Sequence, residues 1–555
     1  MKLFQLKIRN YKAFSEEVTL NLYASRYALI GRNNSGKSTV LNAINLLLGS
    51  KDPRYMNLAE SDYFNIEEDV FIELTMVVDD IKEIWDLPTA QKYKAIFASK
   101  YKKDRFSAQI VITINQKLDN TISDKFTISF AGFPVHQKIS DLRNSLAKNV
   151  IAPPIRDAKD ELSASKWTAY GVLMKSILES SPRYEELNNH LTQLNTLIEE
   201  MLNEEKEQIL SSSQLITFIQ DIKFQLTKEN KPSELLRNLE LFVQENDKFF
   251  HIEDTGTGTQ STIIIAILEL ALKHKATKSK VLCIEEPELF IHPQGIRFLA
   301  QLIDKIVKET GCQVLVSTHS PIFISTLDPR SIIRIEKDKN GSKIHQLPSN
   351  YQDVDNKIKR TLNSENAEMF FSSKVVLVEG ETEQIIFNEI SSSLKTDDGV
   401  EVNYFRNNCT VCSVGGKDNI GNYLDILRKY NIPTKAIVDN DFLDMKRSYS
   451  KICDDNGIDK NLERELLRKQ LENIGVYVIP EGETEDLISN QDLSEITGKS
   501  IKEIEEIKAA EPKTSKAFEK NIFNLTKPEC AYEIVDFYKK KENSPFDNLI
   551  KWGIE

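Results

Sequence analysis

Residues 31–39 combine glycine, lysine and hydroxyl side chains at the spacing of a phosphate-binding loop, G-x4-G-K-S-T. An apolar run precedes them and a segment with helical periodicity follows, which is the context that this motif requires. Glycine lets successive N–H groups turn toward phosphate oxygens, and the helix start adds the positive end of its dipole. We expect Lys37 to neutralise the β- and γ-phosphates of ATP and Ser38 to bind Mg²⁺. The predicted nucleotide contacts are Gly31, Asn33, Asn34, Ser35, Gly36, Lys37, Ser38 and Thr39.

The apolar run Val281–Ile284 ends in two glutamates. A strand that delivers a carboxylate beside a phosphate-binding loop holds the water shell of Mg²⁺. We therefore expect Glu285 to serve the metal ion and Glu286 to polarise the attacking water. The alternative, an ordinary acidic turn after a strand, is disfavoured by the motifs that follow.

Two more segments fit the same nucleotide site. Ser317–Ser320 closes the next apolar run, and we interpret His319 as a sensor of the γ-phosphate rather than as an ordinary core or surface histidine. Gly256–Ser261, with the sequence GTGTQS, opens a helical segment and offers backbone N–H groups to an anion. Its expected nucleotide contacts are Gly258 and Gln260.

A second set of acidic residues occurs in the last third of the chain. Three apolar runs there are predicted as buried strands: Val375–Val378, Ala436–Val438 and Val476–Ile479. The first is followed by an E-G-x-x-E pattern and the second by D-x-D. Because the carboxyl ends of parallel strands meet at one edge of a sheet, we expect these carboxylates to converge. They are Glu379, Glu383, Asp439, Asp441 and those between residues 481 and 486.

Converging carboxylates repel one another unless cations lie among them. No histidine follows His345, so a zinc site with imidazole ligands is disfavoured here. Mg²⁺ or Mn²⁺ suits oxygen ligands better, and two such ions about 4 Å apart would activate water for phosphodiester cleavage. A single acidic strand end is usually a solvated turn, whereas the two patterns on successive strands are more specific.

Composition limits what kind of protein this is. The 555 residues exceed one hydrophobic core, so we expect two to four domains. The net charge of −12 means that any DNA contact must be local or depend on metal ions. The sequence shows no signal peptide and no apolar stretch long enough to span a membrane. With six scattered cysteines, we expect a reduced, cytoplasmic protein; the pair Cys409–Cys412 is interpreted as buried rather than metal-binding.

Changes in hydrophobic periodicity and glycine content divide the chain into segments. Residues 70–78, 108–114 and 126–130 are predicted as strands of an antiparallel sheet. Residues 161–246 have helical spacing and little glycine, which predicts a helical insertion; a dimerisation arm and a packing arm both remain open. Strand–helix–strand alternation on either side of a polar boundary at 347–373 predicts parallel sheets. The predicted domains are 1–160, 161–248 (the insertion), 249–365 and 372–555.

The order of the nucleotide motifs resembles the ATPase heads of the ABC superclass related to recombination and chromosome-maintenance ATPases. Asn10–Phe14, with the sequence NYKAF, is similar to the amino-terminal strand motif of that group. This chain has Glu285 where the group usually has aspartate, and GTGTQS in place of LSGGQ. The resemblance implies an α/β fold: an ABC-type P-loop ATPase head, interrupted by the helical insertion.

The pair of acidic patterns resembles the Toprim domain of topoisomerases, primases and some nucleases, which has a Rossmann-like fold. An ATPase head followed by Toprim is similar to the OLD (overcoming lysogenization defect) family of ATP-dependent endonucleases. The resemblance implies that Glu379 is the metal-linked acid/base. It implies metal ligands at Glu383, Asp439, Asp441 and Glu485, with Ser413 and Gly415–Lys417 as contacts of the scissile backbone.

The same resemblance implies a late lysine at the cleaved phosphate. Lys527 is the first choice, and Lys513 and Lys516 remain alternatives. Arg156-Asp157 resembles a family element that precedes the insertion.

The sequence therefore predicts an ATP-gated, divalent-metal-dependent DNA endonuclease. The resemblance further implies antiphage defence, a homodimer or higher homo-oligomer, and an accessory defence protein as partner. The alternative is an ATP-driven DNA-binding scaffold whose Toprim domain does not cleave. A topoisomerase or primase is a weaker alternative, since no tyrosine is marked as a nucleophile.

Overall fold

The computed structural model describes residues 2–49, 57–78, 108–117, 291–351, 366–395, 399, 401–510, 522–541 and 543–554, and parts of 126–289. They fall into two compact units: Met1–Arg26 with Ser38–Thr318, and Tyr27–Lys37 with His319–Glu555. Arg156-Asp157, Lys513 and Lys516 lie outside the described residues. The bounds of the four predicted domains stay predictions.

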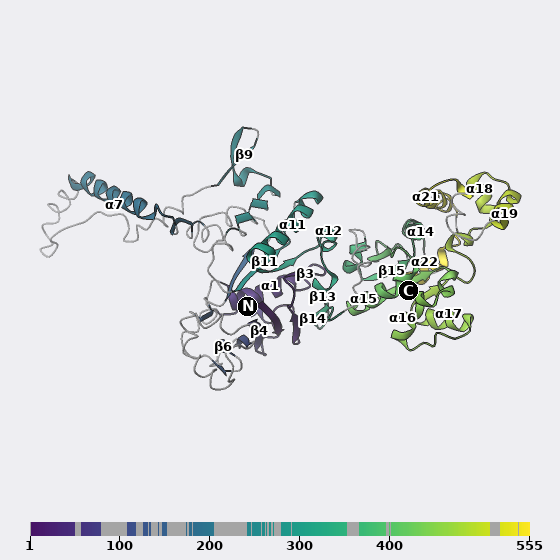
Figure 1. Cartoon of the computed structure of the whole chain (residues 1–555), viewed down its shortest axis with the longest axis horizontal. Helices are drawn as coiled ribbons and strands as arrows, with labels where there is room; N and C mark the ends of the chain where they lie inside the picture. Colours follow the sequence, from purple (N-terminus) through teal and green to yellow (C-terminus); the bar gives the residue numbers. More distant parts are fainter. Residues whose placement is uncertain are drawn as a thin grey trace. The chain divides into compact units, whose positions relative to one another are not determined.

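An antiparallel sheet of six strands dominates the first unit (Figure 1). Alternate side chains of its central strands are buried, as a sheet with one face on the core requires. This confirms the predicted antiparallel strands. In spatial order the strands are β2 (Val18–Asn21), β1 (Lys2–Arg9), β4 (Val70–Val78), β5 (Ala108–Gln116), β6 (Phe126–Phe130) and β7 (Phe133–Pro134).

Three parallel strands of the same unit deliver the glutamate and Ser-Thr-His-Ser motifs. Strand β11 (Ser279–Glu285) pairs with β8 (Ala147–Ala152) on one side and with β12 (Gln313–Ser317) on the other. Helix α11 (Pro293–Thr310) connects β11 to β12 and buries Ile296, Leu299, Ile303 and Ile306 at helical spacing. The predicted strand–helix–strand alternation is confirmed here.

The helical insertion is described in part. Helix α7 spans Tyr184–Met201. The end of the segment is not helical: β9 (Phe242–Glu245) and β10 (Lys248–His251) form an antiparallel hairpin, so the helical prediction was wrong there. Asp247, with φ of 62°, supplies the left-handed turn, and aromatic residues favour extended backbone over helix.

The second unit begins with the strand that precedes the phosphate-binding loop. Strand β3 (Arg26–Ile30) pairs in parallel with β13 (Ile332–Asp338), which pairs antiparallel with β14 (Gly341–Gln346). Helix α1 (Lys37–Leu48) follows the loop in the sequence, belongs to the first unit from Ser38 on, and buries Val40, Leu41, Ile44 and Leu47 with the predicted helical periodicity. Short helical turns of the first unit are η2 (Glu60–Asp62) and η4 (Ile252–Asp254), and those of the second are α12 (Pro321–Ile324), η5 (Pro329–Ser331) and η6 (Asn366–Phe371).

A four-stranded parallel sheet forms the rest of the second unit. Its order is β16 (Cys409–Ser413), β15 (Lys374–Val378), β17 (Thr434–Val438) and β18 (Val476–Val478). All three pairings are parallel, so the carboxyl ends of the strands share one edge. This confirms the sheet predicted from the apolar runs.

Helices cover this sheet (Figure 1). Side chains of α14, α21 and α22 pack with β15, β16 and β17 in one hydrophobic cluster. The helices are α14 (Glu381–Ser391), α15 (Ile420–Lys429), α16 (Lys446–Asn456), α17 (Arg464–Asn473), α18 (Asn490–Thr497), α19 (Ile501–Ala510), α21 (Lys527–Tyr538) and α22 (Asp547–Ile554). Turns η7 (Lys417–Asn419), η8 (Asn440–Asp444) and η9 (Thr484–Leu487) follow β16, β17 and β18.

Candidate nucleotide site and acidic site

Backbone geometry explains the glycines of the phosphate-binding loop. Gly31 has φ of 147°, and a Cβ there would lie 2.2 Å from the carbonyl oxygen of Ile335. Gly36 has φ of 107°, a conformation that side chains with a Cβ rarely adopt. The Ser342 hydroxyl donates to the Ser35 carbonyl at 2.6 Å and so fixes the loop against β14. The loop therefore has the tight turn that its sequence predicts.

Lys37 lies folded over its own loop. Its side chain is 5% exposed, and Nζ is 3.0 Å from the Gly31 carbonyl oxygen and 3.1 Å from that of Arg32. Nζ is also 2.7 Å from Nε2 of His319, which must accept this hydrogen bond as a neutral imidazole because an ammonium can only donate. The His319 ring stacks on Phe371 with centroids 6.4 Å apart. The structure thus brings together the lysine and the histidine that the sequence singled out.

Other loop residues differ in exposure. Thr39 is buried, whereas Asn33, Asn34 and Ser38 are exposed at the loop and at the start of α1. The Ser38 hydroxyl at this position remains a predicted Mg²⁺ ligand.

The glutamate motif ends β11 in an unusual backbone conformation. Glu286 has φ of 41°, in the left-handed region that non-glycine residues seldom occupy. Its N–H donates to the Ser317 carbonyl at 2.9 Å, which holds this strained position. The Thr318 hydroxyl donates to Glu288 Oε1 at 2.7 Å. Glu285 pairs in register with Ser317. The predicted roles of Glu285 and Glu286 stay predictions.

The Gln260 side chain makes hydrogen bonds that hold a turn of the backbone in place. The side chain is buried, and Nε2 donates to the carbonyls of Ile252, Glu253 and Thr255 at 3.0–3.1 Å. These bonds hold the η4 turn against the helical residues that begin at Gly258. A nucleotide contact by Gln260 Nε2 would have to compete with these three acceptors, which share its two N–H groups.

Glu379 and Asp439 meet at the edge of the parallel sheet. They directly follow the paired strands β15 and β17, and the Asp439 N–H donates to Glu379 Oε1 at 3.1 Å. Thr484 in η9 donates from its N–H and hydroxyl to Asp439 Oδ1 at 2.9 and 3.0 Å. Three strand ends therefore contribute to one cluster, as the acidic patterns predict.

Burial and mutual repulsion dominate the electrostatics of this cluster. Burial, then the Asp439 charge, raises the pKa of Glu379 to about 8. Burial, then Glu383 and Glu483, raises the pKa of Asp439 to about 7. The pKa of Glu485, which is 3% exposed, is raised well above its usual value by burial and by Glu383 and Asp439. Such perturbed carboxyl groups gathered at a strand edge are typical of functional sites.

Asp441 has a different environment. Its side chain is half exposed and forms an ion pair with Lys417, whose Nζ also donates to the Asp441 carbonyl at 3.3 Å. Gly416, with φ of 118°, turns the chain so that its own N–H donates to the Glu379 carbonyl at 2.9 Å. The predicted glycine turn thus lies beside the acidic cluster.

One member of the cluster, Thr484, was missed at the sequence level, whereas Glu483 was among the carboxylates of residues 481–486 that were expected to converge. Thr484 and Glu483 act on Asp439, one by hydrogen bonds and the other by its charge. The acidic run after β18 was the available signal, but only the η9 turn decides which of its side chains face inward.

The donor chemistry of this cluster suits a hard divalent cation. It consists of carboxylate and hydroxyl oxygens, and burial and mutual repulsion of the carboxylates raise their pKa values. Within the described residues, no three Asp, Glu, His or Cys side chains are already arranged to hold a metal ion together. Cation binding would therefore require the carboxylates to lose protons and to adjust their side-chain positions.

The late lysine and the cysteine pair have clear places in the chain. Lys527 is the first residue of α21, after the N-cap Thr526, and its side chain lies outside the described part of the structure.

Cys409 and Cys412 are buried in β16, and burial raises the pKa of both thiols to about 12. The interpretation of this pair as buried is confirmed.

Comparison with known proteins agrees with this arrangement. Residues 26–325 match the family described as "AAA domain, putative AbiEii toxin, Type IV TA system". Residues 370–441, which include Glu379, Asp439 and Asp441, match the TOPRIM domain of proteins like the overcoming lysogenization defect protein. The first of these matches spans more than half of the chain, so the chain belongs to that AAA-domain family, and its TOPRIM segment is similar to that of overcoming lysogenization defect proteins. The predicted α/β fold, an ATPase domain followed by TOPRIM, is confirmed.

Relatives match most of the chain. The OLD nuclease of Thermus scotoductus (strain ATCC 700910 / SA-01) is 23% identical, and the alignment covers 79% of this chain and 82% of that protein. Endonuclease GajA of Bacillus cereus (strain VD045) is 25% identical, with coverages of 86% and 81%. The Old nuclease of Escherichia phage P2 is 24% identical, with coverages of 80% and 78%. An ATPase domain joined to TOPRIM, with such relatives, supports an ATPase-nuclease.

Solved structures with similarity include an SMC head domain from Thermotoga maritima. It has a TM-score of 0.33 and 15% identity, and the match covers 63% of this chain and all of that one. A SmcHead bound to the C-winged helix domain of ScpA has a TM-score of 0.38 and 15% identity, with coverages of 63% and 98%. None of the helices in the described ranges has both the length and the apolarity needed to cross a bilayer.

Proposed function

We propose that this protein is a nuclease of the OLD type: an ATP-gated, divalent-metal-dependent DNA endonuclease. The observation that carries the proposal is the contact between Glu379 and Asp439, which lie at the carboxyl ends of adjacent parallel strands and have raised pKa values. A packing role alone gives no reason to bury repelling carboxylates at a strand edge, because such burial is costly without a cation. A scaffold that only docks DNA has no use for them either.

Each residue of the cluster has a proposed task. Mg²⁺ or Mn²⁺, when bound, would polarise the phosphodiester and activate water. Glu379, Glu383, Asp439, Asp441 and Glu485 would hold the ions. Glu379 has a pKa of about 8, so near neutral pH it can also keep or release a proton at Oε1 or Oε2. Lys417 offers a positive charge beside Asp441, suited to a backbone phosphate. Lys527 is the proposed late lysine.

The nucleotide site is proposed to gate this chemistry. Lys37 would leave its own loop carbonyls to bind ATP phosphates, which frees the His319 imidazole to contact the γ-phosphate. Ser38 and Glu285 would serve Mg²⁺, and Glu286 would orient the attacking water. The direction of gating, activation or inhibition, is an outcome of assays with and without ATP.

Glu379→Gln tests the nuclease assignment. The substitution preserves the side-chain shape but removes the ionisable group, so Mg²⁺- or Mn²⁺-dependent nicking of plasmid DNA should fall by about 10²–10⁴-fold. The matched control is Glu381→Gln, because Glu381 is exposed two residues away and should leave nicking unchanged. Undiminished cleavage by pure Glu379→Gln protein would remove the proposed site, and DNA binding without cleavage by the parent protein would favour the scaffold.

The proposal extends to assembly and biological role. Leu194, Leu197 and Met201 of α7 are exposed at helical spacing, as expected of an arm that meets a second copy. The resemblance to the OLD family supports a cytoplasmic role in antiphage defence with an accessory protein. Phage plaque counts on cells with the parent protein and with Glu379→Gln test that role.

A further inference from the structure

Helix α17 leads into β18 through a short turn, and the two elements pack against each other. The helix has 10 residues and rises about 1.5 Å per residue, so its start lies about 15 Å back from its end. Residues 476–480 cover a similar distance in the other direction, at about 3.3 Å per residue. The first turns of α17 are therefore level with the carboxyl edge of the sheet, where the acidic cluster lies.

Two loops that carry acidic residues meet beside this part of α17. The Asn440 N–H donates to the Gly482 carbonyl at 3.1 Å, which joins the loop after β17 to the loop after β18. Asn440 stands between Asp439 and Asp441 in the chain, and Gly482 directly precedes Glu483. The separation of these two loops therefore sets the distance between the carboxylates that they carry.

Arg468 of α17 bridges the same two loops. Its Nη2 donates to Asn440 Oδ1 at 3.0 Å and to the Pro480 carbonyl at 3.0 Å. The side chain is 12% exposed, and its Nε is buried without a hydrogen-bond partner among the described residues. Such burial is costly, and an ion pair with Glu465 on the same helix does not require it, because that pair could form in solvent. The bridge between the loops accounts for the buried position.

Arg464, one helical turn earlier, holds the same asparagine. Its Nη2 donates to the Asn440 carbonyl at 2.6 Å and to Oδ1 at 2.9 Å, and its Nη1 donates to Asp444 at 2.7 Å. Residues four apart lie on one face of a helix, so both arginines reach Asn440 from the same side. An asparagine accepts these bonds without adding a negative charge between Asp439 and Asp441. The turn that carries both aspartates is therefore held by α17.

The two arginines do not neutralise the acidic cluster, because the pKa values of Glu379 and Asp439 stay raised in their presence. Their contribution is the position of the loops. We propose that Arg468, supported by Arg464, is a positioning residue that keeps the loops after β17 and β18 at the separation at which both can supply ligands to divalent cations. This inference rests on the proposed function, since it concerns the same acidic site.

Binding of Mn²⁺ to nucleotide-free protein tests this role without relying on cleavage. Calorimetry should detect Mn²⁺ sites in the parent protein that Glu379→Gln weakens, which assigns them to the acidic cluster. Arg468→Ala should lower the affinity of these sites about tenfold or more, as loss of groups that orient metal ligands usually does. Arg464→Ala should lower it less, because Arg468 still joins the two loops.

Plasmid nicking gives a second measurement. Arg468→Ala should raise the Mn²⁺ concentration needed for half-maximal nicking more than it lowers the rate at saturating Mn²⁺, because bound cations draw the displaced ligands together. A loss of folded protein alone would lower the rate and leave the half-maximal concentration unchanged. Arg468→Lys should restore part of the Mn²⁺ affinity, since an ammonium group also presents several donors, and it serves as the test if Arg468→Ala does not fold.

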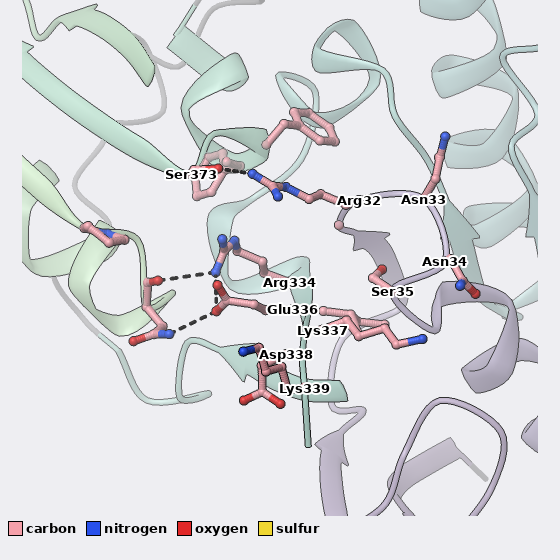
Figure 2. Close-up of a pocket in the computed structure, with 16 residues that line it drawn as sticks. Arg32, Asn33, Asn34, Ser35, Arg334, Glu336, Lys337, Asp338, Lys339 and Ser373 are labelled. Atoms are coloured by element: carbon pink, nitrogen blue, oxygen red, sulfur yellow. Dashed lines mark hydrogen bonds and ion pairs between the residues drawn. The ribbon is translucent and has the colours of Figure 1, made fainter. Parts of the chain in front are cut away.

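Arg334 provides a matched control, because it is also a buried arginine that bridges segments of the second unit. Figure 2 shows its contact with Glu336, to which Nη1 donates at 3.1 Å. Nη1 also donates to the carbonyls of Tyr430 and Asn431, which precede β17, whereas Asp439 follows that strand. Arg334→Ala should therefore leave the Mn²⁺ affinity of the acidic cluster unchanged.

The outcomes separate this inference from the proposed function. Equal Mn²⁺ affinity in the parent and in Arg468→Ala, with Glu379→Gln still weakened, would overturn the positioning role and leave the nuclease assignment standing. An equal loss of affinity in Arg334→Ala would overturn it too. Weaker Mn²⁺ binding by Arg468→Ala, in a protein whose parent form does not cut DNA, would support the positioning role and refute the nuclease assignment.

Discussion

At the scale of single residues, the acidic cluster is defined by how poorly its charges are compensated. Asp441 has Lys417 as an ion-pair partner, whereas Glu379 and Asp439 have hydrogen bonds from a backbone N–H and from Thr484. Those bonds do not offset burial and repulsion, since both pKa values remain raised. A divalent cation would supply the missing positive charge.

This imbalance predicts a pH dependence of stability. The folded protein binds protons on Glu379 and Asp439 more tightly than the unfolded chain does, because the folded pKa values are about 8 and about 7. Without divalent cations, the cluster's contribution to the free energy of unfolding should be largest below pH about 4 and should be lost as pH rises to about 8. Mg²⁺ should restore more stability at high pH, where it need not displace protons.

Thermal melts across this pH range, with and without Mg²⁺, measure the effect. Glu379→Gln should flatten the loss of stability with pH relative to the parent, and Glu381→Gln should not. A variant-minus-parent difference that is constant over the whole range would show that Glu379 titrates normally.

At the scale of elements, the phosphate-binding loop is fixed by its contacts with β13 and β14. The Gly31 Cα faces the Ile335 carbonyl so closely that no Cβ fits, and Ser342 ties down Ser35. The loop is therefore shaped by neighbours about three hundred residues away in the chain.

Gly31→Ala should distort this element. The new Cβ would clash with the Ile335 carbonyl at a φ that alanine avoids, so we expect a loss of about 1–3 kcal/mol in stability and loss of ATP binding. Chemical denaturation and nucleotide titration measure the two effects. Gly457→Ala is the control, because Gly457 also has a positive φ (68°) but a Cβ there meets no atom within 4 Å, and it lies outside the nucleotide motifs. Wild-type ATP affinity in Gly31→Ala would contradict the loop geometry.

At the scale of the whole molecule, two chemistries are joined in one chain. Lys37→Ala should abolish ATP turnover, because phosphate charge is no longer neutralised, and should change the nucleotide response of nicking. Metal-dependent nicking itself should persist, since Lys37 is not part of the acidic cluster. Steady-state ATPase and plasmid assays on the same preparation test both statements, with Lys469→Ala as control. An unchanged ATPase rate would refute the nucleotide site.

Assembly through α7 gives another prediction at this scale. Leu194→Glu with Leu197→Glu places charges on the exposed apolar face of the helix and should convert a dimer to monomers. Thr192→Glu with Thr196→Glu adds the same charge to the opposite face and should leave the dimer intact. Light scattering after gel filtration gives the molar mass of the parent protein and of each double variant. A dimer that survives the leucine substitutions would place the interface elsewhere.

Local patterns in the amino-acid sequence were enough to predict the loop, the strands and the acidic residues that end them. Those features depend on periodicity, glycine spacing and the rule that parallel strand ends share an edge, all of which act over short stretches. Residues 242–245 show the limit of such patterns, because the Asp247 turn and cross-strand pairing overrode helical spacing.

Tertiary structure alone decided which side chains face one another. Thr484 reaches Asp439, and His319 reaches Lys37, only because segments far apart in the chain fold together. Charge compensation depends on the distance between side chains in space, and the spacing of residues along the chain does not determine that distance.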